Sequence, residues 1–140
     1  MQRVDTADLQ LYPHMFPHDI AIWKRFLAKY EKVYQRFEYD IRVGSGTSDV
    51  LGRTDEYARA QEILSKYRID AVSTDQNGVK IIEVKPRATT SAIGQVIVYK
   101  ELYERDYELQ LPVIPAIVTD YEMPDMRYLT RELNIEYIIV

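Results

Sequence analysis

Cysteine is absent from this 140-residue chain, so neither a disulfide nor a thiolate metal site can form. Long apolar runs are missing too: the longest span a few residues, whereas a membrane-spanning helix needs roughly 20. The opening segment MQRVDTADLQ is polar, unlike a secretory signal. These absences predict a soluble cytoplasmic protein, and they suit a reducing compartment.

An excess of positive charge is also lacking, because 18 basic residues face 22 acidic ones and the net charge is −4. Proteins that bind nucleic acid are usually basic, at least locally. Binding to DNA would therefore need a local basic patch, divalent cations or a partner protein. The length, with 46% apolar and 29% charged residues, is typical of a soluble domain and predicts a single domain over residues 1–140.

Apolar residues recur with helical spacing in some segments and alternate with polar residues in others. The expected helices are Ile20–Tyr30 with Asp19 as N-cap, Thr54–Tyr67, Thr90–Tyr107 and Met123–Leu133; the expected strands are Arg36–Val43, two strands around Asn77-Gly78, Val113–Thr119 and Ile135–Val140. This order predicts an α/β fold with a mixed sheet flanked by helices. A right-handed crossover through Thr90–Tyr107 would make its flanking strands parallel.

Several local features follow from the same patterns. The sequence predicts an extended or turning lead-in at Leu11–Phe16, a loop at Thr47–Arg53, one strand face with Phe37, Tyr39, Ile41 and Val43, and one helix stripe with Tyr57, Ala60, Ile63 and Leu64. The terminal strand is expected to be either buried or an edge used in dimerisation.

The dipeptide Asn77-Gly78 lies between two β-prone runs and predicts a hairpin with a type I′ turn. A two-residue loop there would place Asp70 opposite Lys85, with Glu83 on the same face. The Cβ atoms of Asp70 and Lys85 would lie about 5 Å apart, and those of Asp70 and Glu83 roughly 7–8 Å apart. Asp75 belongs to the turn and receives no role.

Two carboxylates without cysteine suit a hard cation, Mg²⁺ or Mn²⁺. Such an ion polarises a phosphoryl oxygen and activates water, and a lysine beside it can orient that water. The alternative is a plain cross-strand ion pair between Asp70 and Lys85, with Glu83 solvated. The apolar residues on both faces of these strands favour the metal site, because a buried Glu83 needs a charge partner.

Asp70, twelve intervening residues and then Glu83-Val84-Lys85 resemble the motif of the PD-(D/E)XK nuclease superfamily, although Ile69 stands where that family usually has proline. The resemblance implies a restriction-endonuclease-like fold and a DNA phosphodiesterase activity. It implies Asp70, Glu83 and the backbone carbonyl of Val84 as metal ligands, and Lys85 as the residue that orients or activates water.

Gln95 and Tyr99 resemble the Q-x-x-x-Y element of the RecB-like exonuclease branch, which implies a role in the active-site shell or in holding the scissile-strand phosphate. Residues four apart share a helix face, so both can point towards the site. The alternative for Tyr99 is ordinary packing with Ala92, Val96 and Tyr103.

Other candidates surround this motif. Lys80, Arg87, Thr89, Thr90 and Ser91 lie near a helix start and are candidate phosphate contacts. His18 stands where RecB-like nucleases often carry a histidine, and Asp19 could supply a helix acid; the alternatives are a surface residue and a cap.

Three functions follow from these patterns. The first is a Mg²⁺- or Mn²⁺-dependent deoxyribonuclease, endo- or exonucleolytic, acting alone, as a homodimer or with a partner that supplies DNA affinity. The second is a non-catalytic nuclease-fold subunit that binds DNA ends or protein. The third is an unrelated α/β interaction domain, which would make the motifs coincidental.

Overall fold

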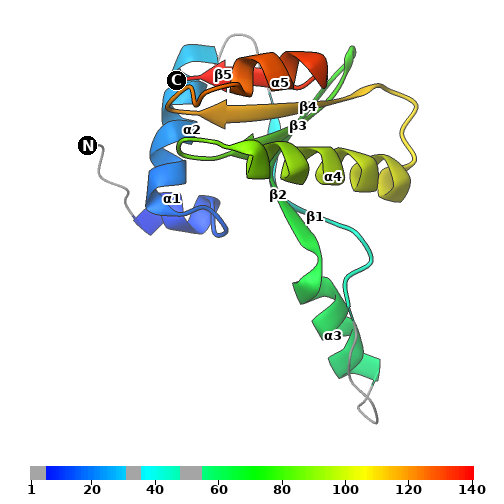
Figure 1. Ribbon diagram of the computed structural model, residues 1–140. Helices are drawn as coiled ribbons and strands as arrows, with labels where there is room; N and C mark the ends of the chain where they lie inside the picture. Colours follow the sequence, from blue (N-terminus) through cyan, green and yellow to red (C-terminus); the bar gives the residue numbers. More distant parts are fainter. Residues whose placement is uncertain (1–5, 31–35, 48–54) are drawn as a thin grey trace.

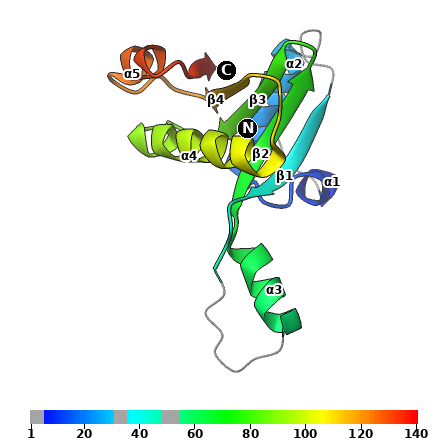
Figure 2. The same ribbon diagram turned by 90° about the vertical axis from the view of Figure 1, so that its right-hand side faces the viewer.

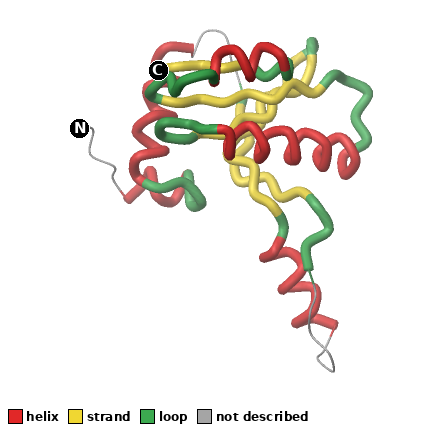
Figure 3. Tube along the Cα trace, viewed as in Figure 1, coloured by secondary structure: helices red, strands yellow, loops and turns green. Residues whose placement is uncertain are grey.

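The computed structural model describes residues 6–30, 36–47 and 55–140, and its centre is a five-stranded mixed sheet with helices on both faces (Figures 1 and 3). The helices are α1 Thr6–Leu11, α2 Pro17–Tyr30, α3 Asp55–Ser65, α4 Thr90–Tyr107 and α5 Met126–Glu132; the strands are β1 Phe37–Val43, β2 Tyr67–Asp75, β3 Gly78–Val84, β4 Val113–Thr119 and β5 Glu136–Ile139. The α/β fold class is confirmed.

The strand order in the sheet, β1-β2-β3-β4-β5, is the order in the chain. The pairs β1–β2 and β2–β3 are antiparallel, whereas β3–β4 and β4–β5 are parallel. The predicted parallel crossover through the helix at Thr90–Tyr107 is therefore confirmed. β5 lies at an edge with its four residues partly buried.

Each face of the sheet carries its own apolar core because side chains alternate along the strands. Ile81 points to a core shared with α4 and α5, here called the α4-side core, and its neighbour Ile82 points to a core shared with α2, the α2-side core. Trp23 and Phe26 fill the α2-side core, fully buried and stacked with ring centroids 4.9 Å apart. The central strand β3 is thus covered on both faces, as its apolar run predicts.

Strand β1 does not keep its apolar residues on one face, so that prediction is wrong. Phe37 and Tyr39 pack into the α2-side core, whereas Ile41 and Val43 pack into the α4-side core. The change occurs at Asp40, which has a left-handed backbone with φ 55°. An L-residue in that conformation breaks the pleat, and period-two alternation cannot continue through it.

The other predicted elements differ mainly at their ends. The lead-in at Leu11–Phe16 begins with the last residue of α1, a helix the patterns did not predict, and then turns. The predicted helix at Thr54–Tyr67 is α3, but Thr54 and residues 48–53 of the predicted loop lie outside the described residues, and Tyr67 begins β2. No helix in the described part of the chain has the length and apolar character to cross a bilayer.

Helix α3 stands apart from the sheet, and both views show it projecting from the ends of β1 and β2 (Figures 1 and 2). None of its 11 residues is buried. Its predicted stripe of Tyr57, Ala60, Ile63 and Leu64 is exposed rather than packed on the sheet. The spacing of the apolar residues correctly indicated a helix with an apolar side. It did not indicate what that side contacts.

Candidate active site

The β2–β3 hairpin turns at Gln76 and Asn77, because Asp75 pairs with Gly78. Neither turn residue has a positive φ, so the predicted type I′ turn at Asn77-Gly78 is wrong. The Asp75 carboxylate instead accepts hydrogen bonds from the N–H groups of Asn77, at 2.7 Å, and Gly78, at 3.1 Å. An aspartate that bonds the backbone two residues ahead fixes a turn without positive φ.

Glycine is needed at position 78 because the backbone just before β4 comes very close to it. A Cβ atom on Gly78 would lie 2.7 Å from the Pro112 carbonyl oxygen, which accepts a hydrogen bond from the N–H of Val79. The glycine that resembled a turn residue therefore lets β4 pair with β3.

The strand register consequently differs by two residues from the expected one. Val72 pairs with Ile81 rather than with Glu83. Continued one step beyond the last pair, the register places Asp70 opposite Glu83, not opposite Lys85. Because an even shift preserves the face of every side chain, the two carboxylates still meet. Lys85 follows the last residue of β3 and is exposed.

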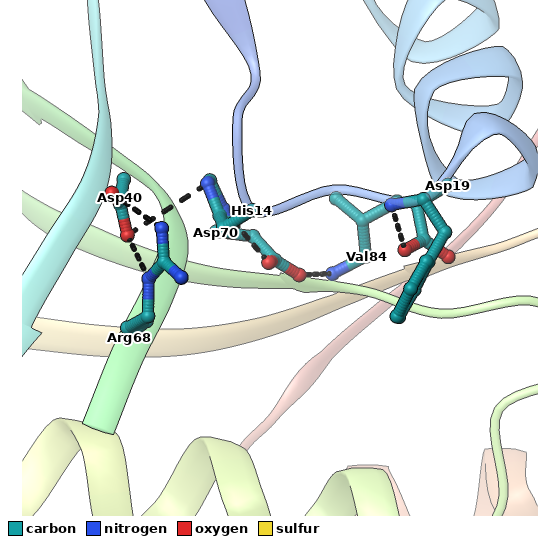
Figure 4. Close-up of polar contacts among 7 residues, drawn as sticks. His14, Asp19, Asp40, Arg68, Asp70 and Val84 are labelled. Carbon is teal, nitrogen blue, oxygen red and sulfur yellow. Dashed lines mark hydrogen bonds and ion pairs between the residues drawn. The ribbon is translucent and has the colours of Figure 1, made fainter. Parts of the chain in front are cut away.

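Asp70 connects the hairpin to the segment between α1 and α2 (Figure 4). One carboxylate oxygen accepts the backbone N–H of Val84 at 2.7 Å, and the other lies 3.0 Å from Nε2 of His14. The hydrogen bond to Val84 holds the Asp70 side chain across the gap where the β2–β3 ladder ends. Asp70 is therefore fixed in place beside Glu83.

His14 is a buried histidine that the sequence analysis did not select. Its side chain is 4% exposed, with Nδ1 3.8 Å from an oxygen of Asp40. Among the described residues, neither ring nitrogen makes a well-aligned hydrogen bond. Leaving buried polar atoms unsatisfied costs free energy, so such atoms call for a missing ligand or water.

Asp40 is oriented by Arg68, whose guanidinium donates to both carboxylate oxygens, with Nη2 at 2.8 Å (Figure 4). This hydrogen bonding lowers the pKa of Asp40 and keeps its carboxylate ionised beside His14. Asp40 and Asp70 occupy opposed positions on β1 and β2, between the pairs Tyr39–Ala71 and Ile41–Ile69, where the backbone of β1 is left-handed. The break in the β1 pleat therefore directs an acidic residue towards the site.

Glu83 is 7% exposed although it is a carboxylic acid. Its pKa is raised to about 9, first by burial and then by the neighbouring Asp70, through negative charge and a hydrogen bond to the protonated form. Two carboxylic acids this close, one of them buried, need either a shared proton or a cation. Glu83 is therefore not a solvated partner of a surface ion pair.

Asp19 lies in the first turn of α2, so its prediction as the N-cap is wrong by three residues. Phe16 precedes the helix, and its N–H donates to the Asp19 carboxylate at 3.0 Å, the backward bond of a capping box. Burial raises the pKa of Asp19, and the charge of Asp70 adds to this effect. His18 is largely exposed and lies 3.2 Å from Asp120.

Tyr99 belongs to the α4-side core, as the packing interpretation of its position predicts. Its pKa is raised by burial and then by the negative charges of Glu83 and Asp70. Its ring centroid is 5.9 Å from that of Tyr67. Gln95, one helical turn earlier, is exposed at the surface of α4.

The predicted phosphate contacts separate into two groups. Lys80 lies three residues before Glu83, on the opposite face, where its ammonium is 2.7 Å from Glu136 of β5. Arg87, Thr89, Thr90 and Ser91 are exposed between β3 and the first turn of α4, with Thr89 as N-cap. The second group therefore follows Lys85 in the chain, whereas Lys80 lies on the opposite face of β3 from Glu83.

The side chains at the site supply some, but not all, of the ligands that a divalent cation requires. Two ligands at right angles, each about 2.1 Å from one octahedral ion, lie about 3.0 Å apart, which matches the His14–Asp70 separation. Glu83 supplies a second carboxylate. Within the described ranges, no three acidic or histidine side chains already form a complete metal cage.

The residues that sequence reasoning missed share a recognisable setting. His14 stands between Tyr12 and Met15, both buried, and Asp40 interrupts an apolar strand. A polar residue flanked by apolar ones that all face a core is an informative signal. Arg68 had no such signal, because its role depends on the position of Asp40.

Comparisons with known proteins support the fold. No protein-family model and no curated protein matches the sequence. The structure is similar to that of EndoMS in a complex with double-stranded DNA, with a TM-score of 0.51 and 15% identity over 86% of this chain and 43% of that one. A protein of unknown function, AF1548, is similar at a TM-score of 0.49 and 10% identity over 86% of this chain and 56% of that one. The chain spans less than two thirds of either protein. The likeness to the EndoMS structure supports the architecture of a mixed sheet with flanking helices.

Proposed function

We propose that the protein is a metal-dependent nuclease that hydrolyses phosphodiester bonds in DNA. The observation that carries this proposal is the pairing of buried Glu83 with Asp70, beside a histidine whose ring nitrogens make no well-aligned hydrogen bond within the described residues. Burying two acids costs stability unless a cation offsets their charge. The similarity of the fold to that of EndoMS, solved with DNA, supports DNA as the substrate.

Asp70, Glu83 and His14 would hold the cation, together with the backbone carbonyl of Val84 as the family resemblance implies. A divalent cation there supplies Lewis-acid chemistry, making the phosphorus of a phosphodiester easier for water to attack. Carboxylates suit Mg²⁺ and Mn²⁺ alike, whereas imidazole nitrogen is a better ligand for a transition-metal ion such as Mn²⁺ than for Mg²⁺. His14 therefore favours Mn²⁺ over Mg²⁺ as the more effective ion.

Lys85 extends from the end of β3 towards solvent, where an attacking water and the substrate would enter. Its ammonium can orient that water and offset the negative charge that develops on the phosphate oxygens. Tyr99 closes the inner wall beside Glu83, and Gln95 offers an exposed amide on the same helix. Arg87 and the first turn of α4 at Thr89–Ser91 would contact the flanking phosphate.

A cleavage assay tests this proposal directly. The full chain is incubated with linear, nicked, branched and single-stranded DNA in Mg²⁺, Mn²⁺ or EDTA. We expect cleavage that needs the ion and is faster in Mn²⁺. Glu83→Gln should lower the rate at least about 100-fold, the upper end of the loss when metal-supporting groups are removed. Its charge-matched control, Glu101→Gln, alters a side chain that is 67% exposed on α4 and should leave the rate unchanged.

Glu83→Gln keeps the side-chain volume and the neutral state that the raised pKa gives Glu83 in the metal-free protein, so loss of activity would not reflect unfolding. Absence of ion-dependent cleavage on every substrate, or wild-type activity in Glu83→Gln, would contradict the proposal. DNA binding without cleavage would favour the non-catalytic nuclease-fold subunit instead.

A further inference from the structure

Three chain segments meet beside the carboxylates and form a rim around the candidate site. Asp120 directly follows β4; it accepts the backbone N–H of Arg87 at 2.8 Å and lies 3.2 Å from Nε2 of His18. Asp19, next to His18, interacts electrostatically with Asp70. The start of α2, the β3–α4 loop and the end of β4 are therefore held together at the site.

Two aromatic rings are exposed on this rim. Phe16, which precedes α2, is 74% exposed, and no other large apolar side chain in the described residues is as exposed. Tyr121 is 52% exposed, with the Arg87 guanidinium 5.0 Å from its ring centroid. Arg87 has a left-handed backbone with φ 43°, a conformation that costs free energy in a residue with a side chain.

We propose that Phe16, Tyr121 and Arg87 bind unpaired bases of a single-stranded DNA segment next to the scissile phosphate. Exposed aromatic faces beside an arginine stack on bases of any sequence. The bases of a duplex already stack on one another and cannot offer their faces. A chain of net charge −4 gains little from the phosphates alone, so stacking would have to supply affinity.

The position of the scissile phosphate rests on the proposed function, but binding of the bases does not, so binding is measured in EDTA. The probe is a fluorescent oligonucleotide of about 12 nucleotides, within the site sizes of known single-strand binders, compared with its duplex. We expect the single strand to bind more tightly. Phe16→Ala and Tyr121→Ala should each raise its Kd about fivefold or more, and Tyr121→Phe should retain most of the affinity.

Helix α5 offers a matched control, because Tyr128 is 57% exposed and Arg131 lies 5.7 Å from its ring centroid. Tyr128→Ala should leave the Kd unchanged. Any of three results would overturn this inference. The duplex could bind as tightly as the single strand or more tightly, the single strand could show no measurable binding, or Phe16→Ala and Tyr121→Ala could both leave the Kd unchanged. Binding through the rings without any cleavage in Mn²⁺ would refute only the nuclease proposal.

A second inference rests on helix α3, independently of the site. The carboxyl end of this helix is attached to the body, since Arg42 donates to the Ile63 carbonyl at 2.9 Å and the N–H of Thr47 donates to Ser65 Oγ at 2.6 Å. The remaining turns project away from the sheet (Figures 1 and 2). A helix of 11 residues with no buried side chain is marginal in water without a covering surface.

The sequence of α3 is complementary to itself in the antiparallel direction. A shallow hollow on this helix is lined by Tyr57, Ala60, Gln61, Leu64 and Ser65. If two copies cross between residues 60 and 61, Tyr57 of each copy meets Leu64 of the other, and the small Ala60 lies near the axis. The same arrangement places Asp55, in the acidic first turn, against Lys66, and it opposes the two helix dipoles.

We infer that a second copy of this chain covers the apolar side of α3 in a two-fold symmetric, antiparallel pair. DNA is a poor alternative occupant, because the helix carries three acidic residues and one basic residue. Closed two-fold contacts use the same patch on both copies, as this pattern requires. One helix pair is small beside the roughly 1,000 Å² of a stable interface, so the dimer should be weak and concentration-dependent.

Sedimentation equilibrium of the full chain over a dilution series tests this pairing. Leu64→Glu should weaken dimerisation at least about tenfold, since it places a charge against Tyr57 of the other copy. Leu11→Glu, at another exposed leucine, should not. Lys66→Glu should also weaken the dimer, and adding Asp55→Lys should restore it. A monomer at every concentration, a dimer indifferent to Leu64→Glu, or no rescue by the charge exchange would overturn the inference.

Discussion

Polar residues usually lie at the surface of a protein and apolar residues in its interior. Glu83 and Leu64 both depart from this rule, in opposite directions. Glu83 is an acid that is 7% exposed, and Leu64 is an apolar residue that is 72% exposed. The acid is buried beside Asp70, whose carboxylate in turn lies 3.0 Å from His14. The apolar side chain is exposed on a helix that contributes nothing to either core.

The contrast shows how differently the two regions obtain their stability. Around Glu83, the apolar cores on both faces of β3 stabilise the fold and so offset the cost of burying an acid. On α3, no residue belongs to either core, and within the described residues hydrogen bonds attach its carboxyl end to the body. We therefore expect substitutions in the two regions to have very different effects on the free energy of unfolding.

The largest difference should appear between two apolar truncations. Trp23 is fully buried in the α2-side core, so Trp23→Ala should lower the free energy of unfolding by about 3–5 kcal/mol. Leu64→Ala, measured at concentrations too low for dimerisation, should change it by less than about 0.5 kcal/mol. Urea denaturation followed by circular dichroism measures both values. A large loss in Leu64→Ala would show that α3 packs on its own body.

A smaller effect should follow from pH in the metal-free protein. The pKa of Glu83 is raised from 4.5 to about 9, so the folded protein keeps a proton that the unfolded chain has lost. The free energy of unfolding should therefore fall as the pH rises from about 5 towards 9, by up to about 1.4 kcal/mol per pH unit. Urea denaturation in EDTA at several pH values measures this slope.

Glu83→Gln serves as the control for that slope, because glutamine cannot titrate. The variant should lose most of the pH dependence, and Mn²⁺ should reduce the slope of the wild type by stabilising the ionised carboxylates. A slope that is the same in Glu83→Gln would assign the effect to another group.

The smallest effect concerns the attachment of α3. Gly46 has φ +68°, and a Cβ atom there would lie 2.0 Å from the carbonyl oxygen of Glu62 in α3. Gly46→Ala should displace the helix and cost about 1–2 kcal/mol. Gly94→Ala, in α4 with nothing within 4 Å, should instead stabilise by up to about 1 kcal/mol. Denaturation combined with limited proteolysis tests both, and equal effects would contradict the close contact.

Much of the fold was predictable because long periodic segments specify their own structure. The helix Thr90–Tyr107 and the strand Val113–Thr119 have the predicted ends. The hairpin register was not predictable from Asn77-Gly78 alone, because Asp75 determines the turn through its side chain. The approach of Asp70 and Glu83 was still predictable, since the error of two residues preserved the alternation.

The remaining features of the site depend on contacts between distant segments. His14 reaches Asp70 because the segment between α1 and α2 packs against the sheet, and no local pattern specifies that approach. Asp40 changes the face of β1 through a backbone conformation that its residue type permits but does not require. Alternation can predict which residues share a face only where the backbone remains regular.

The sequential order of the five strands has a consequence for how the protein folds. Each strand pairs with the strand that precedes it in the chain, so every new strand can join an edge that already exists. Such local connectivity lowers the contact order and shortens the search for native pairings. We expect the β1–β3 meander to assemble first, bringing Asp70 beside Glu83 before α4 delivers Tyr99. On a ribosome, the two acids would then meet while the rest of the chain is still being synthesised.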